Sequence, residues 1–213
     1  MAFHSIEKEN WDRREYFDHY FTAVPCTYSM TVKLDVTHLV NSGERFYPAM
    51  LYCLSKAVNR HQQFKMTWDQ EKGLGWYDMV HPSYTIFHPD TETFSCLWTP
   101  YQEEYSLFRK AYEEDQVKYG DIHRFLSRTD TPANTFSVSM IPWESFDSFN
   151  LNLQNGYDYL PPIFTMGRYR EENGKILLPL SIQVHHAVCD GFHVCRLVKD
   201  LREILEEKFW EEL

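Results

Sequence analysis

The feature that most constrains this chain is an apolar run that ends in two histidines and an Asp-Gly turn. The run from Ile176 to Ile182 is rich in leucine and isoleucine, which predicts a buried β-strand. Asp190-Gly191 then interrupts the pattern, and apolar residues recur at helical spacing from Val194 to Leu205. A strand therefore delivers His185 and His186 to its end, and a turn carries an aspartate to the start of a helix.

Three interpretations of these residues compete. A histidine at a strand end is most often a hydrogen-bonded structural residue, and an Asp-Gly pair is most often only a turn. The second interpretation is a metal site, but adjacent strand residues point to opposite faces, so His185 and His186 cannot share one ion. His186, Asp190 and His193 could still converge, although no HExxH or CxxC spacing supports a metal and we expect none. The third is catalysis, because a histidine with an ordinary pKa of about 6.5 suits a general base near neutral pH.

The nine residues from His185 to His193 favour catalysis, because they resemble a known active-site signature. The run His-His-Ala-Val-Cys-Asp-Gly-Phe-His is similar to that of the chloramphenicol acetyltransferases. The shorter HHxxxDG pattern is shared with a wider set of CoA-dependent acyltransferases and condensation domains, whereas the nine-residue form is much more specific. The resemblance runs through most of the chain. It implies an α/β fold of the two-layer sandwich type, with a mixed β-sheet and helices packed on one face.

The resemblance also implies roles for five residues in a direct acetyl transfer from acetyl-CoA, without an acyl-enzyme. His186 would take the proton of the acceptor hydroxyl, and Ser139, in a Ser-x-x-Pro-Trp strand, would donate to the oxyanion. Thr165 would help to hold a water near that oxyanion. Arg13, in a Trp-x-Arg sequence, would form an ion pair with Asp190 and fix the loop after the histidine. The chain has no Gly-x-Ser-x-Gly sequence, so we do not expect Ser139 to act as a nucleophile.

Binding residues follow from the same resemblance. In the family the acceptor, chloramphenicol, lies in a pocket of aromatic and aliphatic side chains. The matching positions, all apolar or amphipathic, are Tyr20, Val24, Tyr28, Phe94, Cys96, Leu151, Tyr159 and Ile163. The resemblance assigns no residue to the pocket wall near Phe125-Leu126. For CoA it implies Arg168 near the phosphates, with Arg45 as a second candidate and Trp143 beside them. It also implies a homotrimer in which each site lies between two subunits.

Composition restricts the class of protein further. A chain of 213 residues is long enough for one sizeable core, and we expect a single domain over residues 1–213. The net charge of −10 offers no basic surface to nucleic acid or to an anionic membrane. Five cysteines in apolar surroundings suggest reduced thiols. The first residues lack the features of a signal peptide and no run is as long as a membrane span, so we expect a cytoplasmic protein.

Alternating and helical patterns predict the remaining elements. The expected strands are Cys26 to Val36, Phe64 to Trp68, Trp76 to Val80, Tyr84 to His88, Thr93 to Trp98 and Phe136 to Met140. The expected helices are Trp11 to Tyr20, Arg45 to Val58 and Gln102 to Tyr119. The residues from Glu171 to Gly174 are expected to form a hairpin turn into the strand that ends in the histidines.

Three other functions remain open at this point. The first is an acetyltransferase with the same catalytic residues but a different hydroxyl or amine acceptor. The second is a relative of the acyltransferase core of the pyruvate dehydrogenase complex, against which the absence of a lipoyl domain and linker argues. The third is a protein of this fold that binds the drug without turnover, because a fold does not determine a function. Drug binding without release of a thiol would distinguish the third from an enzyme.

Overall fold

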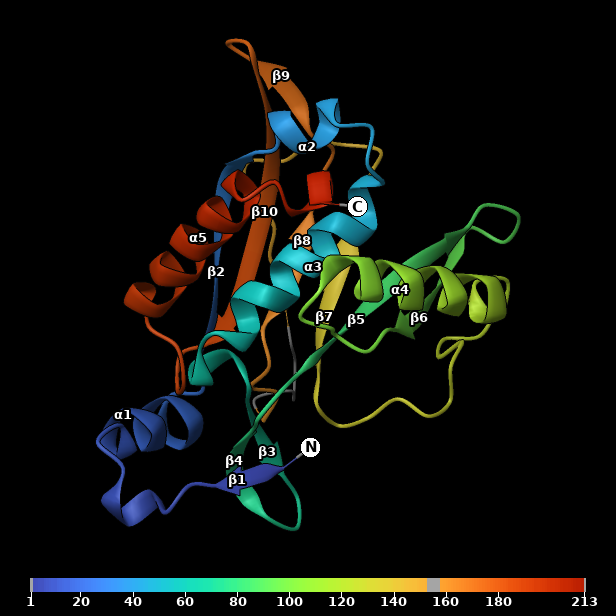
Figure 1. Cartoon of the computed structure of the whole chain (residues 1–213). Coiled ribbons are helices and arrows are strands. Elements are labelled where there is room, and N and C mark those ends of the chain that lie inside the picture. Colours follow the sequence, from blue (N-terminus) through green and yellow to red (C-terminus); the bar gives the residue numbers. More distant parts are fainter. Residues whose placement is uncertain (1, 153–157, 213) are drawn as a thin grey trace.

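A mixed β-sheet with helices on one face forms the body of the molecule (Figure 1). The computed structural model describes residues 2–152 and 158–212. The strand order is β2-β10-β8-β7-β5-β6, and β9 pairs with one end of β10. The strands are β2 (Thr27–Asp35), β5 (His81–His88), β6 (Thr93–Trp98), β7 (Thr135–Met140), β8 (Ile163–Met166), β9 (Arg170–Glu172) and β10 (Lys175–His185). β7 runs parallel to β5 and β8, and the other pairs are antiparallel.

Three long helices cover one face of this sheet. They are α3 (Phe46–Asn59), α4 (Tyr105–Tyr119) and α5 (Gly191–Glu206), and α3 lies between the other two (Figure 1). α3 is buried along most of its length, whereas α4 and α5 bury one apolar stripe each, as expected for helices at the edges of such a layer. The short helix α2 (Thr37–Asn41) packs against α5 and β10, and α1 (Arg14–Asp18) lies outside the layer. β1 (Phe3–Ser5), β4 (Gly73–Tyr77) and β3 (Met66–Asp69) form a separate small sheet.

The opposite face of the sheet carries two adjacent rows of side chains in register. Leu180 and Ile182 of β10 are buried in the core, so the alternate residues Ser181 and Gln183 point away from it. One row runs across β2, β10, β8 and β7 through Thr31, Ser181, Thr165 and Ser139. The next row runs across the same strands through Ser29, Gln183, Ile163 and Ser137. Hydroxyl groups therefore line this face from β2 as far as β7.

β5 and β7 are paired over only part of their length, and beyond it the two strands separate. β5 and β7 pair from His81 opposite Thr135 to Tyr84 opposite Val138, and their register ends there. β5 continues to His88 against β6 alone, while β7 continues to Met140 against β8 alone. Ser139 therefore lies at the point where two parallel strands separate.

The predicted α/β fold with a mixed sheet and helices on one face is confirmed. The hairpin into the histidine strand also forms, and Asn173 and Gly174 take the positive φ angles, 53° and 74°, that a two-residue turn requires. The helix expected from Trp11 to Tyr20 is wrong in its form: α1 is short and continues as a π-helical turn, His19–Ala23. Such turns displace side chains from α-helical spacing, and this one brings Tyr20 against the ring of His186.

Candidate active site

His186 lies one residue beyond the end of β10, and its ring is held between two tyrosines. The imidazole is stacked on Tyr20, with ring centroids 4.0 Å apart and planes 9° from parallel. Tyr28 of β2 meets the same ring at a distance of 5.2 Å and an angle of 67°. The backbone N–H of His186 donates to the carbonyl oxygen of Cys26 (2.9 Å). These contacts fix the plane of the ring and leave 29% of the side chain exposed to a substrate.

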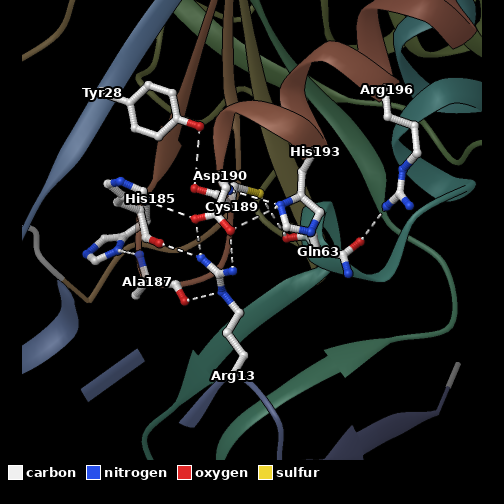
Figure 2. Close-up of polar contacts among 10 residues, drawn as sticks. Arg13, Tyr28, Gln63, His185, Ala187, Cys189, Asp190, His193 and Arg196 are labelled. Carbon is white, nitrogen blue, oxygen red and sulfur yellow. Dashed lines mark hydrogen bonds and ion pairs between the residues drawn. The ribbon is translucent and has the colours of Figure 1, made fainter. Parts of the chain in front are cut away.

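The loop after His186 is tied to the N-terminal segment by the guanidinium of Arg13 (Figure 2). Arg13 donates to both carboxylate oxygens of Asp190, at 2.6 and 2.7 Å, so the expected ion pair forms in its bidentate geometry. It also donates to the carbonyl oxygens of His186 and Ala187, both at 2.8 Å. The hydrogen bonds from Arg13 hold the pKa of Asp190 below its usual value. One arginine thus fixes the loop at three residues and keeps the aspartate ionised.

Asp190 also lies against the histidine that precedes it. Nδ1 of His186 is 3.2 Å from a carboxylate oxygen of Asp190, although the direction is not that of a hydrogen bond. Nδ1 is buried, so Nε2 is the nitrogen that a substrate can reach. The carboxylate of Asp190 therefore lies beside the buried nitrogen of the ring, on the side away from the substrate.

His193 has a structural role that was not predicted from the sequence. Asp190 is the N-cap of α5, and its side chain accepts from the backbone N–H of His193. The ring of His193 in turn accepts the backbone N–H of Asp190 at Nδ1 (3.0 Å), which completes a capping box. Burial, followed by the nearby charge of Arg13, lowers the pKa of His193. Asp-x-x-His at the start of a helix was the available signal, since the third helical position is where a capping box places its second side chain.

The same contacts show what the other residues of the signature do. His185 is 1% exposed, and its Nδ1 accepts the backbone N–H of Ala187 (3.1 Å), so this histidine shapes the turn. His186 and His193 both approach Asp190, but Arg13 already occupies the carboxylate that a metal ion would need. Among residues 2–152 and 158–212, no group of three histidine, cysteine, aspartate or glutamate side chains could hold a metal ion.

A cavity of about 850 Å³ lies where β5 and β7 separate. We call it the Ser139 cavity, because the hydroxyl of Ser139 lies on its wall, 3.1 Å from the hydroxyl of the buried Thr165. Of the pocket residues predicted from the sequence, Phe94, Cys96, Leu151 and Ile163 line this cavity. Tyr159 lies next to it, with its hydroxyl 3.0 Å from that of the lining residue Ser137.

The structure does not place the whole predicted pocket around Ser139. Tyr20 and Tyr28 pack on His186 instead, and Val24 is 52% exposed at the end of the π-helical turn beside Tyr20. The wall that the sequence left unassigned is also present. An isolated bridge joins Cys96 to Leu126, and this brings Phe125 to the cavity. The short bridge has no repeating pattern, so the sequence gives no signal for it.

Ser139 and His186 are far apart within one chain. Ser139, Thr165 and Ser181 are in register across three strands. His186 lies five residues beyond Ser181, and at about 3.4 Å per residue this is a distance of about 17 Å along β10. No hydroxyl or thioester could contact the imidazole and the Ser139 hydroxyl of the same chain at once, because both contacts require about 3 Å.

The predicted CoA residues lie around the Ser139 cavity. Trp143 lines it, is 57% exposed and meets the ring of Phe87 edge to face at 4.7 Å. The backbone N–H of Arg168 donates to the carbonyl oxygen of Glu144 (2.8 Å), so this exposed arginine is next to Trp143. Arg45 is exposed too, with its guanidinium 5.7 Å from the ring of Tyr112, another lining residue. Two exposed arginines thus belong to segments that adjoin lining residues of the cavity, and the guanidinium of Arg45 also lies 3.6 Å from the carboxylate of Glu113.

Solved structures show which class of fold this arrangement belongs to. A chloramphenicol acetyltransferase superposes with a TM-score of 0.79 at 20% identity, and the match covers 96% of this chain and 100% of that one. A dihydrolipoamide acetyltransferase from Azotobacter vinelandii superposes with a TM-score of 0.66 at 17% identity, covering 90% of this chain and 85% of the other. The chain therefore has the fold of the acyltransferases.

Sequence comparisons narrow this class to one family. The family model of chloramphenicol acetyltransferase matches residues 1–202. A chloramphenicol acetyltransferase from Clostridium perfringens is 58% identical over 205 residues, covering 96% of this chain and 99% of the relative. Another, from Clostridioides difficile, is 57% identical over 205 residues, covering 96% and 97%. The chain belongs to the chloramphenicol acetyltransferase family and is an enzyme of that family.

Proposed function

We propose that this chain transfers the acetyl group of acetyl-CoA to the 3-hydroxyl of chloramphenicol and thereby inactivates the antibiotic. The relatives that share more than half of its residues carry the name of this activity. The observation that carries the proposal is the hydroxyl of Ser139 on the wall of a cavity large enough for a small molecule and a thioester, with the hydroxyl of the buried Thr165 3.1 Å behind it.

The proposed reaction is a direct transfer with one general base. Nε2 of His186 takes the proton of the acceptor hydroxyl while its oxygen attacks the thioester carbonyl. The hydroxyl of Ser139 donates to the oxyanion of the tetrahedral intermediate, a contact worth about 2.7–4 kcal/mol of barrier in acyl transfer. The intermediate collapses by breaking the carbon–sulfur bond, and the imidazolium of His186 returns its proton to the departing CoA thiolate. No acyl-enzyme forms.

We propose further that the enzyme is a homotrimer in which His186 of one chain acts at the Ser139 cavity of its neighbour. The separation of about 17 Å along β10 supports this arrangement, because neither end has the complete set of groups. Tyr20, Val24 and Tyr28 lie at the His186 end and would complete the acceptor pocket across the interface. Phe94, Cys96 and Leu151 would form the opposite wall.

The donor would enter the Ser139 cavity from the side of its cationic residues. Arg168 and Arg45 are exposed next to Trp143 and Tyr112, where they can meet the phosphates of CoA. The acceptor and the thioester would then meet at Ser139 from different sides, which orients both reactants.

A cytoplasmic location is part of the proposal. Cys26, Cys53, Cys96, Cys189 and Cys195 are free thiols, as is usual in the reducing cytoplasm. In the part of the chain that the structure describes, no helix is long and apolar enough to cross a membrane.

Release of a thiol from acetyl-CoA, with and without chloramphenicol, tests the proposed function. The proposal predicts release that depends on the drug, and a His186→Ala variant that binds the drug but releases no thiol. Release with another hydroxyl compound but not with chloramphenicol would keep the mechanism and change the acceptor. Tight drug binding without release under any condition would contradict the enzyme and favour a binding protein.

A further inference from the structure

Three consecutive residues that belong to no strand or helix are held against the sheet by polar side chains of β2 and β10, two of which are buried. Ser181, which is 2% exposed, donates to the carbonyl oxygen of Phe149 (2.7 Å). Ser29 donates to the side-chain oxygen of Asn150 (2.9 Å). Gln183 holds Leu151, the residue that lines the Ser139 cavity. The segment therefore depends on side chains for the hydrogen bonds that a strand would take from its neighbour.

The contact between Gln183 and Leu151 is the most specific of these. The amide oxygen of Gln183 accepts the backbone N–H of Leu151 (2.9 Å), and its amide nitrogen donates to the backbone carbonyl of the same residue (2.8 Å). Gln183 is 4% exposed, so its amide is buried and makes both of these hydrogen bonds away from bulk water. The pair fixes both the position and the orientation of Leu151.

The row in which Gln183 lies connects it to the cavity. Gln183 is in register with Ile163, which is in register with Ser137, and both of these residues line the Ser139 cavity. The amide of Gln183 therefore sets where Leu151 stands relative to Ile163. Leu151, which belongs to no strand or helix, is thereby held in a fixed position relative to Ile163, which is part of the sheet.

We propose that Gln183 is a positioning residue that fixes the acceptor side of the Ser139 cavity through Leu151. This inference rests on the proposed function, because it takes the acceptor to be the molecule that contacts Leu151. Trp143, Arg168 and Arg45, the residues assigned to CoA, receive no hydrogen bond from Gln183 among those the structure describes. Loss of the Gln183 amide should therefore weaken acceptor binding and leave donor binding unchanged.

The test is Gln183→Met, which keeps the length of the side chain and removes both hydrogen bonds. The matched control is Asn59→Leu. Asn59 makes the same kind of pair with one backbone residue, accepting from the N–H of Val80 (2.8 Å) and donating to its carbonyl (2.9 Å). Neither Asn59 nor Val80 lines the Ser139 cavity. The two variants lose equivalent hydrogen bonds in different places, so their comparison separates general loss of stability from loss of the wall.

We expect Gln183→Met to raise the KM for chloramphenicol about tenfold, with the KM for acetyl-CoA unchanged. Asn59→Leu should lower the melting temperature and leave both KM values unchanged. A Leu151→Ala substitution in each background sharpens the test, because the effects of Gln183→Met and Leu151→Ala on chloramphenicol should be far from additive if one acts through the other. Equal KM changes for both substrates, or additive effects, would overturn the inference.

Direct binding of chloramphenicol, measured by calorimetry, keeps this test separate from that of the proposed function. If the unsubstituted enzyme binds the drug but releases no thiol, the reaction is wrong, and weaker binding by Gln183→Met would still support the inference. If Gln183→Met fails to fold, Gln183→Glu replaces it, since a carboxyl group of nearly the same shape keeps the acceptor for the N–H of Leu151. Unchanged drug affinity in a folded variant, or no drug binding by the unsubstituted enzyme, would overturn the inference.

Discussion

The two ends of the site are built in different ways. The His186 end, formed by Arg13, Tyr20, Tyr28, His186 and Asp190, depends on side-chain contacts between segments far apart in the sequence. The Ser139 cavity depends on strand register, which places Ser139, Thr165 and Ser181 in one row. A base must be oriented through its ring, whereas an oxyanion donor must be placed by a rigid backbone. Each end is therefore sensitive to a different kind of substitution.

His186→Ala should have the largest effect, because it removes the base and leaves the rest of its end in place. We expect kcat to fall by about 10²–10⁴-fold. Drug affinity and melting temperature should change little, since the backbone of His186 keeps its contacts with Cys26 and Arg13. Steady-state kinetics and thermal melting check this, and a nearly normal kcat would remove His186 as the base.

Ser139→Ala tests the end that depends on strand register. We expect kcat to fall by about 10²–10³-fold with both KM values nearly unchanged, because the hydroxyl contributes only in the transition state. Ser137→Ala is the matched control, since Ser137 lies on the same face of β7 but pairs with Tyr159. Equal losses of kcat in the two variants would contradict a special role for Ser139.

Arg13→Met should lower stability and activity together, which distinguishes the His186 end from the Ser139 cavity. We expect the free energy of unfolding to fall by about 1–3 kcal/mol, less than for a dry pair, because 38% of the Asp190 side chain is exposed. Arg14→Met is the control, since Arg14 is half-exposed and its contact with Asp18 is 3.9 Å long. Denaturant unfolding measures both, and equal stability in the two variants would contradict the role of the pair.

The same pair predicts how stability depends on pH. Arg13 holds the folded-state pKa of Asp190 below its usual value. Its contribution to stability is therefore complete above the ordinary aspartate pKa of about 3.9 and is lost as the pH falls through the lowered value. Arg13→Met should lose less stability than the unsubstituted protein when the pH is lowered from about 5 to 2. Parallel pH profiles of the melting temperature would contradict this.

Arg168→Met should have the smallest effect. We expect the KM for acetyl-CoA to rise about two- to fivefold, because an exposed charge contributes little in water, and the rise should shrink at high salt. Arg170→Met is the control, since Arg170 is already paired with Glu172 (2.7 Å). Kinetics at two ionic strengths check this, and identical results for the two arginines would remove Arg168 from the CoA site.

Long strands and helices, and the site residues directly beside them, could be predicted from the sequence. β2, β10 and α5 are long enough to show alternation or helical spacing, and the His186 signature joins two of them. β8 and β9 are too short to show a pattern, and the π-helical turn that carries Tyr20 is set by its contact with His186. The pairing of Arg13 with Asp190 was predicted from the family resemblance, although the two residues lie near opposite ends of the chain.

The sequence could not predict how separate strands and segments are placed relative to one another. Within one chain the predicted pocket residues lie in two places, some at the His186 end and others at the Ser139 cavity. Strand register makes this division, and register is not visible in a single strand. The contact of Gln183 could not be predicted either, because its partner, Leu151, lies in a segment without a pattern.

The most direct test of the account is activity in mixed trimers. His186→Ala and Ser139→Ala chains are refolded together in equal amounts and assayed for chloramphenicol-dependent thiol release. If the base of one chain acts at the cavity of its neighbour, random assembly gives intact sites in about a quarter of positions, and about a quarter of the normal activity returns. If both groups act within one chain, the mixture has no more activity than the average of the two variants, and that result would contradict the account.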